Sequence, residues 1–269
     1  MIRYFCLVPL LSDFGKAMFV DTHCHMDDSS FTGRLPEIIA RADAAGVGRF
    51  IVPGVGPAGW DGIMTIAAKE RRIFAAPGVH PLKGAECCDE ALGRLELLTS
   101  DAVAIGEIGL DYSYPVPREV QQHAFRAQLG MAVSRGLPVI LHCRRAFADL
   151  LRIFREERGN RVGGVMHAFS GSPETALECI RLGLVIGVAG PVTYANAVRP
   201  AEVVRRIPLD RILLETDAPD LAPFPYRGML CEPAFLPETA RKVAAVKGVT
   251  VEEVARVTTV TAERLFMLN

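Results

Sequence analysis

The sequence predicts an α/β fold in which eight strand–helix units close into a TIM-type (β/α) barrel. Short apolar runs rich in β-branched residues recur along the chain, and their starts lie roughly 20 to 36 residues apart, the spacing of strand–helix units. Most runs lack a polar–apolar alternation, as expected of strands buried on both faces. Half of the 269 residues are apolar, which suffices for one large core. An open, doubly wound sheet is the alternative, but no GxGxxG turn follows the first run.

Eight segments are predicted as the strands of this barrel. In chain order they are Met18–Thr22, Arg49–Pro53, Ile73–Pro77, Ala102–Gly106, Pro138–Leu141, Gly164–Met166, Leu184–Val188 and Arg211–Leu214. The segments between them carry helix start and stop signals, as a parallel sheet requires. The clearest signals are Pro36 with Gly46, Arg118–Arg135 with Gly136, Ser172-Pro173 with Gly183, and the capping box Thr250–Glu253.

Residues 18–269 are expected to form a single barrel domain. Residues 1–17 precede the first strand, and we expect an extension that is either disordered or the product of an early start codon. Its apolar run, Tyr4–Leu11, is interrupted by Pro9 and lacks a clear cleavage site, which disfavours a signal peptide. No stretch approaches the ~20 apolar residues that a membrane span requires, so no membrane association is expected.

The charge balance and the cysteines narrow the class of protein further. With 30 basic and 31 acidic residues, the chain has no general attraction for nucleic acid, so a nucleic-acid substrate would be held by a few local phosphate contacts. The seven cysteines are odd in number and include no CxxC pair, which favours a reducing, cytoplasmic location over a disulfide framework. Nothing in the sequence indicates an obligate protein partner.

Histidine gives the sharpest functional signal. Five of the six histidines lie at or just after the end of a predicted strand, and only His123 lies in a predicted helix. The C-terminal strand ends form the active-site face of an α/β barrel. Because histidines with purely structural roles have no reason to gather there, the sequence predicts a functional site at the barrel mouth.

His23 and His25 follow the first predicted strand as an HxH pair. Residues i and i+2 of a strand project to the same side, so both imidazoles can enter the mouth while Cys24 points toward the helix layer. Two converging imidazoles suit a borderline cation such as Zn²⁺ or Mn²⁺. A pair of hydrogen-bonded core histidines is the alternative, and the polar residues at the other strand ends argue against it.

Further polar residues end the fourth, fifth, sixth and eighth predicted strands: Glu107, His142, His167 and Asp217. A carboxylate is costly to bury unless it is paired or bound to metal, and Glu107 could bridge two cations with one oxygen for each. A salt bridge from Glu107 to a loop arginine is the alternative. Asp217 is preferred to the deeper Glu215 as the acid that binds metal and orients or deprotonates a water.

Three residues are candidates for substrate binding. His80 follows the third predicted strand and could bond a phosphate or brace its loop. Arg145 follows His142 and could pair with a phosphate oxygen, and Arg227 lies in the long Pro/Gly-rich segment 218–233. Both arginines could instead be solvated loop residues. The role of Asp111 stays undecided, with shaping of its loop as one possibility.

Six segments resemble the motifs of the TatD-type deoxyribonuclease family, in order along the chain. They are Asp21–His25, Gly78–Pro81, Gly106–Asp111, Pro138–His142, His167–Gly171 and Glu215–Pro219. The combination is specific although each motif alone is weak, and the match extends from Met18 to the C-terminus. Cys231 departs from the pattern, because many members have Asn before the Glu-Pro pair, and this bears on how substrate is held.

The resemblance implies a TIM-type barrel of the amidohydrolase-like group that holds two divalent cations, Zn, Mn or Mg. By matching positions the metal ligands are His23, His25, Glu107, His142, His167 and Asp217. Glu107 and Asp217 are then also the catalytic residues, with Glu107 bridging. The resemblance further implies hydrolysis of phosphodiester bonds in DNA, with 3′–5′ exonuclease character on single strands or 3′ ends.

Two other functions remain open from the residues. Related barrels hydrolyse amides, lactones or esters such as aminoacyl esters, but many bridge their metals with a carboxylated lysine, and no lysine stands at a predicted strand end. A non-catalytic, metal-stabilised scaffold is the second alternative. It predicts a saturated coordination shell without an open position.

Overall fold

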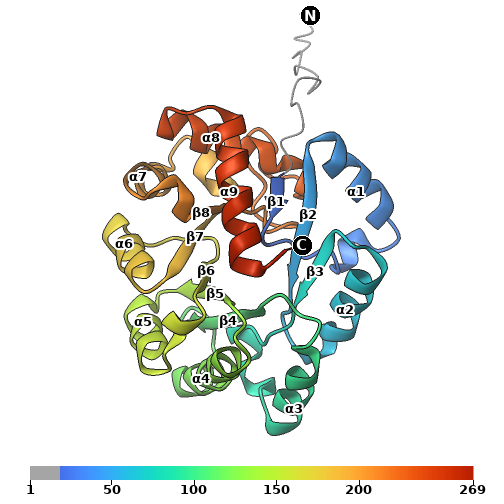
Figure 1. Ribbon diagram of the computed structural model, residues 1–269, viewed down its shortest axis with the longest axis vertical. Coiled ribbons are helices and arrows are strands. Elements are labelled where there is room, and N and C mark those ends of the chain that lie inside the picture. The colour runs from blue at the N-terminus through green and yellow to red at the C-terminus, as the bar shows by residue number, and fades with distance from the viewer. Residues whose placement is uncertain (1–18, 269) are drawn as a thin grey trace, which may run out of the picture.

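The computed structural model describes residues 19–268, so the extension expected over residues 1–17 lies outside the described part. Eight strands form a ring surrounded by helices, with α9 across one end (Figure 1). The strands are β1 (Phe19–Asp21), β2 (Val47–Pro53), β3 (Ile73–Ala76), β4 (Ile105–Asp111), β5 (Val139–Arg144), β6 (Gly164–Met166), β7 (Leu184–Val188) and β8 (Ile212–Leu214). The α-helices are α1 (Leu35–Ala44), α2 (Trp60–Lys69), α3 (Asp89–Leu98), α4 (Arg118–Arg135), α5 (Phe147–Glu156), α6 (Pro173–Arg181), α7 (Val198–Arg206), α8 (Leu236–Lys247) and α9 (Val251–Phe266). The 3₁₀ turns are η1 (Ser29–Phe31), η2 (Pro57–Gly59), η3 (Pro81–Glu86), η4 (Gly159–Arg161), η5 (Gly190–Thr193), η6 (Leu209–Arg211) and η7 (Pro233–Phe235).

All of the strand pairs are parallel. They form a three-stranded sheet in the order β1-β2-β3 and a five-stranded sheet in the order β4-β5-β6-β7-β8. Backbone hydrogen bonds join the two sheets at both seams. The Gly54 amide donates to Gly106 at one seam, and the Thr22 amide donates to Leu214 at the other. The predicted TIM-type barrel is therefore confirmed.

Two strands extend further toward the mouth than the sequence predicts. The fourth strand was expected to end at Gly106, but β4 continues to Asp111 and pairs Gly109 with His142. Gly109 makes this approach possible, since a Cβ there would lie 2.0 Å from the His142 carbonyl oxygen. The prediction was wrong because glycines next to an acid resemble a strand end. Glu107 and His142 consequently project from inside paired strands rather than from loops.

The barrel interior changes from apolar to polar along each strand. Near the α9 end, Ile140, Val165 and Leu213 belong to a buried cluster that Phe266 closes from α9. Two residues later along the chain stand His142, inside β5, and His167 and Glu215, directly after β6 and β8. The two-residue period of extended chain places them on the same side. The interior of the barrel is thus apolar at the α9 end and polar at the mouth.

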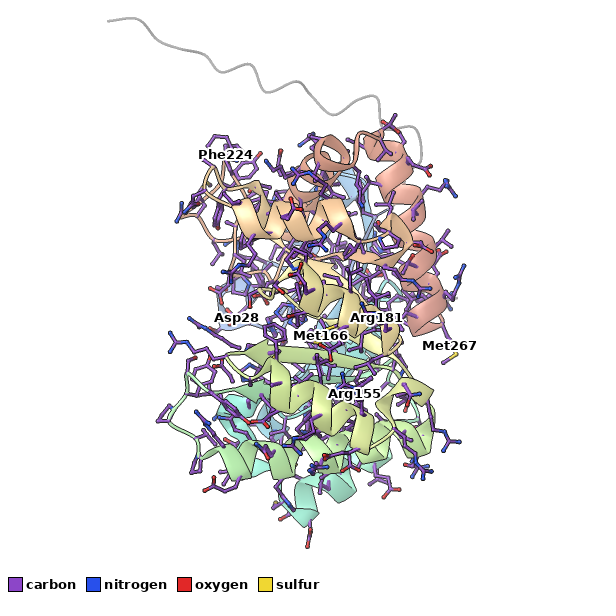
Figure 2. The ribbon with its side chains drawn as sticks, turned by 90° about the vertical axis from the view of Figure 1, so that its left-hand side faces the viewer. Asp28, Arg155, Met166, Arg181, Phe224 and Met267 are labelled. Carbon is purple, nitrogen blue, oxygen red and sulfur yellow. The ribbon has the colours of Figure 1, made fainter. Side chains whose placement is uncertain are left out.

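The two faces of the barrel are visible from the side. Asp28 and Phe224, on segments that follow β1 and β8, lie on one side of the molecule, and Met267, after α9, lies on the other (Figure 2). The predicted helix signals act locally as expected: the Ser172 hydroxyl accepts the Thr175 amide, and the Thr250 hydroxyl accepts the Glu253 amide. Across residues 19–268, no helix combines the length and the apolar character that a membrane crossing requires.

Candidate metal centre

A pocket of about 230 Å³ opens at the C-terminal ends of the strands. It brings together residues from at least five strand ends that are far apart in sequence. Its ionisable and aromatic lining consists of His25, His80, Glu107, Tyr114, His142, His167, Asp217 and Asp220. His23 lies directly beneath, fully buried. All six side chains expected to hold metal are therefore neighbours, which was the geometric requirement of the sequence-based hypothesis.

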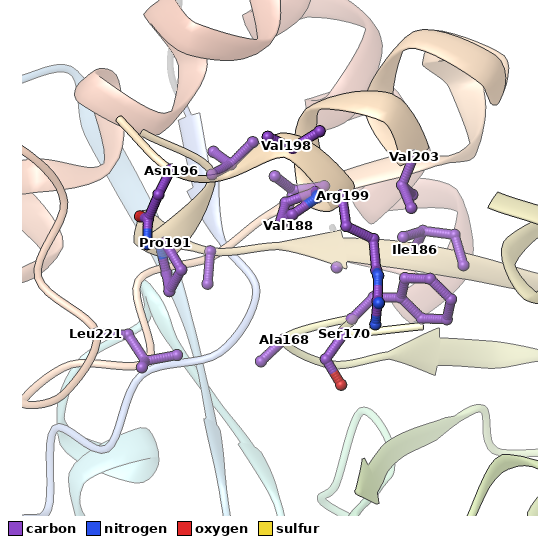
Figure 3. A pocket seen from close by; sticks show the side chains of 15 residues that line it. Ala168, Ser170, Ile186, Val188, Pro191, Asn196, Val198, Arg199, Val203 and Leu221 are labelled. Atoms are coloured by element: carbon purple, nitrogen blue, oxygen red, sulfur yellow. The ribbon is translucent and has the colours of Figure 1, made fainter. Parts of the chain in front are cut away.

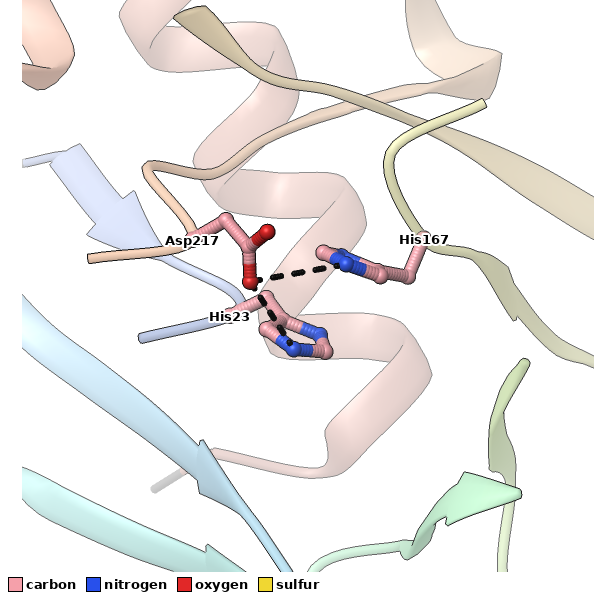
Figure 4. Close-up of side chains that lie close together, drawn as sticks. All are labelled: His23, His167 and Asp217. Atoms are coloured by element: carbon pink, nitrogen blue, oxygen red, sulfur yellow. Dashed lines mark ion pairs between the residues drawn. The ribbon is translucent and has the colours of Figure 1, made fainter. Parts of the chain in front are cut away.

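One part of the cluster, which we call the open half, contains His23, His25, His167 and Asp217. The Asp217 Oδ1 atom lies 3.5 Å from both His23 Nε2 and His167 Nε2 (Figure 4). It also lies 3.6 Å from His25 Nε2. The His23 and His167 rings stack at 3.4 Å between centroids. These nitrogen–oxygen separations are too long for good hydrogen bonds. The open half thus gathers ligand atoms around a point without bonding them to one another.

The other part, which we call the closed half, contains Glu107, Asp111 and His142. The His142 ring bridges the two acids, with Nδ1 2.7 Å from Glu107 Oε1 and Nε2 2.9 Å from Asp111 Oδ2. Asp111 also accepts the Ser113 amide at 2.8 Å. The second oxygen of Glu107 turns toward the open half, 3.4 Å from His23 Nε2. Glu107 therefore touches both halves, as a bridging ligand would.

Against the effect of burial, each half contains a histidine whose pKa is raised by neighbouring carboxylates: His142 in the closed half and His167, to about 10, in the open half. Burial, reinforced by His167, lowers the pKa of His23 well below its ordinary value, so its imidazole is neutral. Burial would also lower the pKa of His142, but the charge of Glu107 and the bond to Asp111 raise it to about 9. Burial alone would raise the pKa of Glu107, yet the surrounding histidines hold it well below its usual range. Burial raises the pKa of Asp217 to about 6.

Two buried carboxylates support the cluster from behind. Glu215 accepts the Ala168 amide and lies 3.2 Å from His167 Nδ1, which fixes the ring with Nε2 toward Asp217. Asp21 accepts the Thr216 amide at 3.0 Å and its hydroxyl at 2.6 Å, and so ties the ends of β1 and β8 together. Carboxylates that hold the far side of a ligand ring are a regular feature of metal sites.

The donor set fits divalent cations on two grounds. First, both ring nitrogens of His23 are buried without a hydrogen-bond partner among residues 19–268, an arrangement that is costly in the absence of a ligand. Second, a tetrahedral ion with bonds of about 2.1 Å separates its ligand atoms by roughly 3.4 Å. The separations of 3.4 to 3.6 Å around His23, His25 and Asp217 match that value.

The three residues predicted to bind substrate differ in their position relative to the pocket. His80 lies in the pocket, buried, with its Nδ1 accepting the Leu82 amide and its Nε2 3.9 Å from Glu107. Arg145 is exposed after β5 and has a positive φ of 56°. Arg227 stacks on Tyr194, 4.4 Å from the ring centroid. Only His80 of the three lines the pocket at the cluster.

Several polar residues of the site were not assigned from sequence. Asp111 was left undecided and bonds His142, and Glu215 was placed deeper than Asp217 and supports His167. Tyr114 and Asp220 line the pocket, and their positions in loops gave no signal. Cys24 points away from the cluster as expected, toward the Ile51 carbonyl. The period-two spacing of Glu215 and Asp217 was the available clue to a supporting acid.

The barrel and its His/carboxylate mouth define a metal-dependent hydrolase of the amidohydrolase-like group. The chain belongs to the family described as TatD related DNase, whose model matches residues 20–267. The expected family membership is thereby confirmed.

Relatives support this placement over nearly the whole chain. The uncharacterized metal-dependent hydrolase YabD of Bacillus subtilis is 40% identical over 255 residues, covering 94% of this chain and 100% of that protein. The 3′-5′ ssDNA/RNA exonuclease TatD of Cronobacter sakazakii is 36% identical, covering 93% and 98%. The crystal structure of the TatD homologue YjjV of Escherichia coli superposes with a TM-score of 0.89 at 34% identity, covering 93% and 98%.

Proposed function

We propose that this protein is a phosphodiesterase that removes nucleotides from the 3′ ends of single-stranded DNA with the help of two divalent cations. The observation that carries the proposal is the set of His23, His25, His167 and Asp217 ligand atoms held at the spacing of a shared ion. The name of the Cronobacter relative, a 3′-5′ ssDNA/RNA exonuclease, supports the choice of substrate. The near-neutral charge of the chain suits short substrates held at one point.

Six residues would hold the cations: His23, His25, Glu107, His142, His167 and Asp217. Glu107 supplies one oxygen to each half and would be shared between the ions. Bound divalent cations lower the pKa of water and offset charge on phosphoryl oxygens. Asp217 orients the attacking water and accepts its proton. Zn, Mn and Mg are all compatible with this donor set.

The remaining pocket residues position the substrate. His80 borders the pocket beside Glu107 and His142, where it can contact a phosphoryl oxygen. Arg145 and Arg227 lie outside this pocket, so we assign them contacts with phosphates further along the strand. Such rim cations contribute mainly to affinity and to its salt dependence.

The test is incubation of single-stranded DNA carrying a 3′ label with the purified protein and Mn²⁺, Mg²⁺ or Zn²⁺ in turn. We expect release of labelled mononucleotides, abolished by chelation and in a His142→Ala variant. An ester such as p-nitrophenyl acetate serves as the comparison substrate for the amidohydrolase alternative. Turnover of the ester without turnover of DNA under any cation would overturn the proposal.

A further inference from the structure

A second cavity lies beside the metal centre. It has a volume of about 580 Å³ and is framed by β7, the segment after β6, η5 and the start of α7 (Figure 3). Pockets of this size accommodate small organic ligands. No residue assigned above to the metals or to catalysis lines it.

The cavity adjoins the metal centre through two residues. Ala168 directly follows His167, and Leu221 directly follows Asp220; both line the cavity, while His167 and Asp220 line the metal pocket. Neighbouring residues of the same two segments therefore line both spaces.

The cavity wall next to the metals is held in place by the segment after β8. The Tyr194 hydroxyl donates to the Ala222 carbonyl at 2.8 Å, and the Phe224 amide donates to the Thr193 hydroxyl at 2.8 Å. Gly190 allows this close packing, since a Cβ there would lie 2.1 Å from the Leu221 carbonyl oxygen. The cavity is thus a preformed feature and needs no rearrangement to accept a ligand.

Its walls and rim have the chemistry of a binding site for a flat heteroaromatic ring. Ile186, Val188 and Val203 give apolar surfaces, and Phe169 gives an aromatic one, steadied by an edge-to-face contact with Phe147 at 5.4 Å between centroids. At the rim stand the Asn196 amide and the Arg199 guanidinium. Apolar and aromatic faces with hydrogen-bonding groups at the edge are how proteins bind an unstacked base.

Arg199 differs from the other arginines of its helix. Arg205 pairs with Glu202 and Arg206 with Glu174, whereas Arg199 forms no ion pair or hydrogen bond with any residue in the described range 19–268. It stands in the first turn of α7, where the helix dipole favours acidic rather than basic residues. In Figure 3 its side chain reaches from α7 toward Ser170 at the cavity. Helix stability therefore does not explain this residue.

We propose that this cavity binds the nucleobase of the 3′-terminal nucleotide, the one released by cleavage. Phe169, Val188 and Val203 would contact the faces of the base, and Arg199 and Asn196 would bond its edge. This inference rests on the proposed function, because the phosphodiester at the metals places the base within reach of the cavity. It predicts that a base on this nucleotide contributes to recognition without any contact with the metals.

The first test compares an intact oligonucleotide with one whose 3′-terminal nucleotide lacks its base. Since stacking and edge contacts with one base change affinity by about tenfold or more, we expect kcat/KM of the wild type to fall by about that factor for the abasic substrate. Arg199→Ala should raise KM for the intact substrate with little change in kcat, and should shrink the penalty for the missing base. Arg205→Ala, on the same helix, is the matched control and should behave as wild type.

The second test needs no turnover and so separates this inference from the proposed function. Calorimetric titration of the metal-loaded protein should show that dAMP binds about tenfold more tightly than 2-deoxyribose 5-phosphate. Val188→Phe, which fills the cavity, should remove the difference. Equal binding of the two ligands by the wild type would overturn the cavity assignment, whereas base-dependent binding without DNA hydrolysis would overturn the phosphodiesterase assignment alone.

Discussion

The open and closed halves of the metal centre handle buried polar groups in different ways. In the open half, His23 is fully buried with both ring nitrogens unbonded within residues 19–268, and the Glu107 and Asp217 oxygens lie 3.4 and 3.5 Å from its Nε2 atom. In the closed half, His142 bonds Glu107 and Asp111 directly at 2.7 and 2.9 Å. A buried polar group without a partner costs about 1–3 kcal/mol.

The difference indicates which half needs a ligand from outside the chain. The closed half satisfies its own hydrogen bonds, because each ring nitrogen of His142 bonds a carboxylate oxygen. The open half leaves both ring nitrogens of His23 without a hydrogen-bond partner among residues 19–268, and the Asp217 Oδ1 atom lies 3.5 to 3.6 Å from the nearest histidine nitrogens, too far for good hydrogen bonds. We therefore infer that cation binding stabilises the open half more strongly than the closed half. Variants of the two halves can test this inference.

The largest effect is expected from Asp217→Asn in the open half. The amide keeps the shape and one oxygen for coordination but cannot accept a proton from water, and general-base catalysis is worth about 10²–10⁴ in rate. We expect kcat to fall by about 10³ with the metal content nearly unchanged. Steady-state kinetics and elemental analysis of the same preparation provide the measurement. Turnover close to wild type would remove Asp217 from the mechanism.

The second prediction concerns thermal stability, because the rise in Tm on adding cation can be compared between variants of the open and closed halves. A cation at a hundred times its Kd stabilises the folded state by about 2.7 kcal/mol, which corresponds to a rise in Tm of about 5–10 °C for a chain of this size. We expect this rise in wild type on adding Mn²⁺ or Zn²⁺, and little of it in His23→Ala. Asp111→Asn, in the closed half, serves as the comparison and should retain most of the rise. An equal loss in both variants would contradict the asymmetry.

The third prediction concerns the carboxylate behind the open half. Glu215→Gln weakens the contact with His167 Nδ1 while leaving the ligand atoms themselves in place. Replacement of such supporting groups typically reduces metal affinity or activity by about 10–100-fold. We expect a loss in this range that excess cation partly restores. A titration of activity against cation concentration distinguishes this positioning role from a purely structural one, which added cation would not rescue.

The sequence predicted the barrel and the location of the cluster because both depend on local patterns. Apolar runs indicated the strands, and His142 and His167 were placed at the mouth because each directly follows such a run. The contacts within the cluster were not predictable, because they depend on distances between strands. The hydrogen bond between His142 and Asp111 requires β4 to run beyond Gly106, which the glycines concealed.

The cavity beside the metal centre was even less predictable from the sequence than the contacts within the cluster. Its wall combines β7, the segment after β6 and α7 with Leu221. Only the segment after β6 belongs to a motif, His167–Gly171, and the sequence assigned a role there to His167 alone. Apolar side chains facing a cavity read like any other core residues. Arg199 was indistinguishable from solvated arginines until the structure showed that its helix neighbours are paired and it is not.

The smallest effect is expected from a change far from the metal centre, which shows how much a general loss of stability alters Tm and cation binding. Thr250 caps α9 by accepting the Glu253 amide at 3.2 Å, on the helix that closes the opposite end of the barrel. Thr250→Ala should cost about 1 kcal/mol, as N-cap replacements do, and lower Tm by about 2–4 °C. The rise in Tm on adding cation and the value of kcat should both match wild type, because neither half of the centre moves. A reduced cation effect in this variant would mean that stability lost anywhere in the barrel weakens metal binding, and the asymmetry between the halves would then need a different explanation.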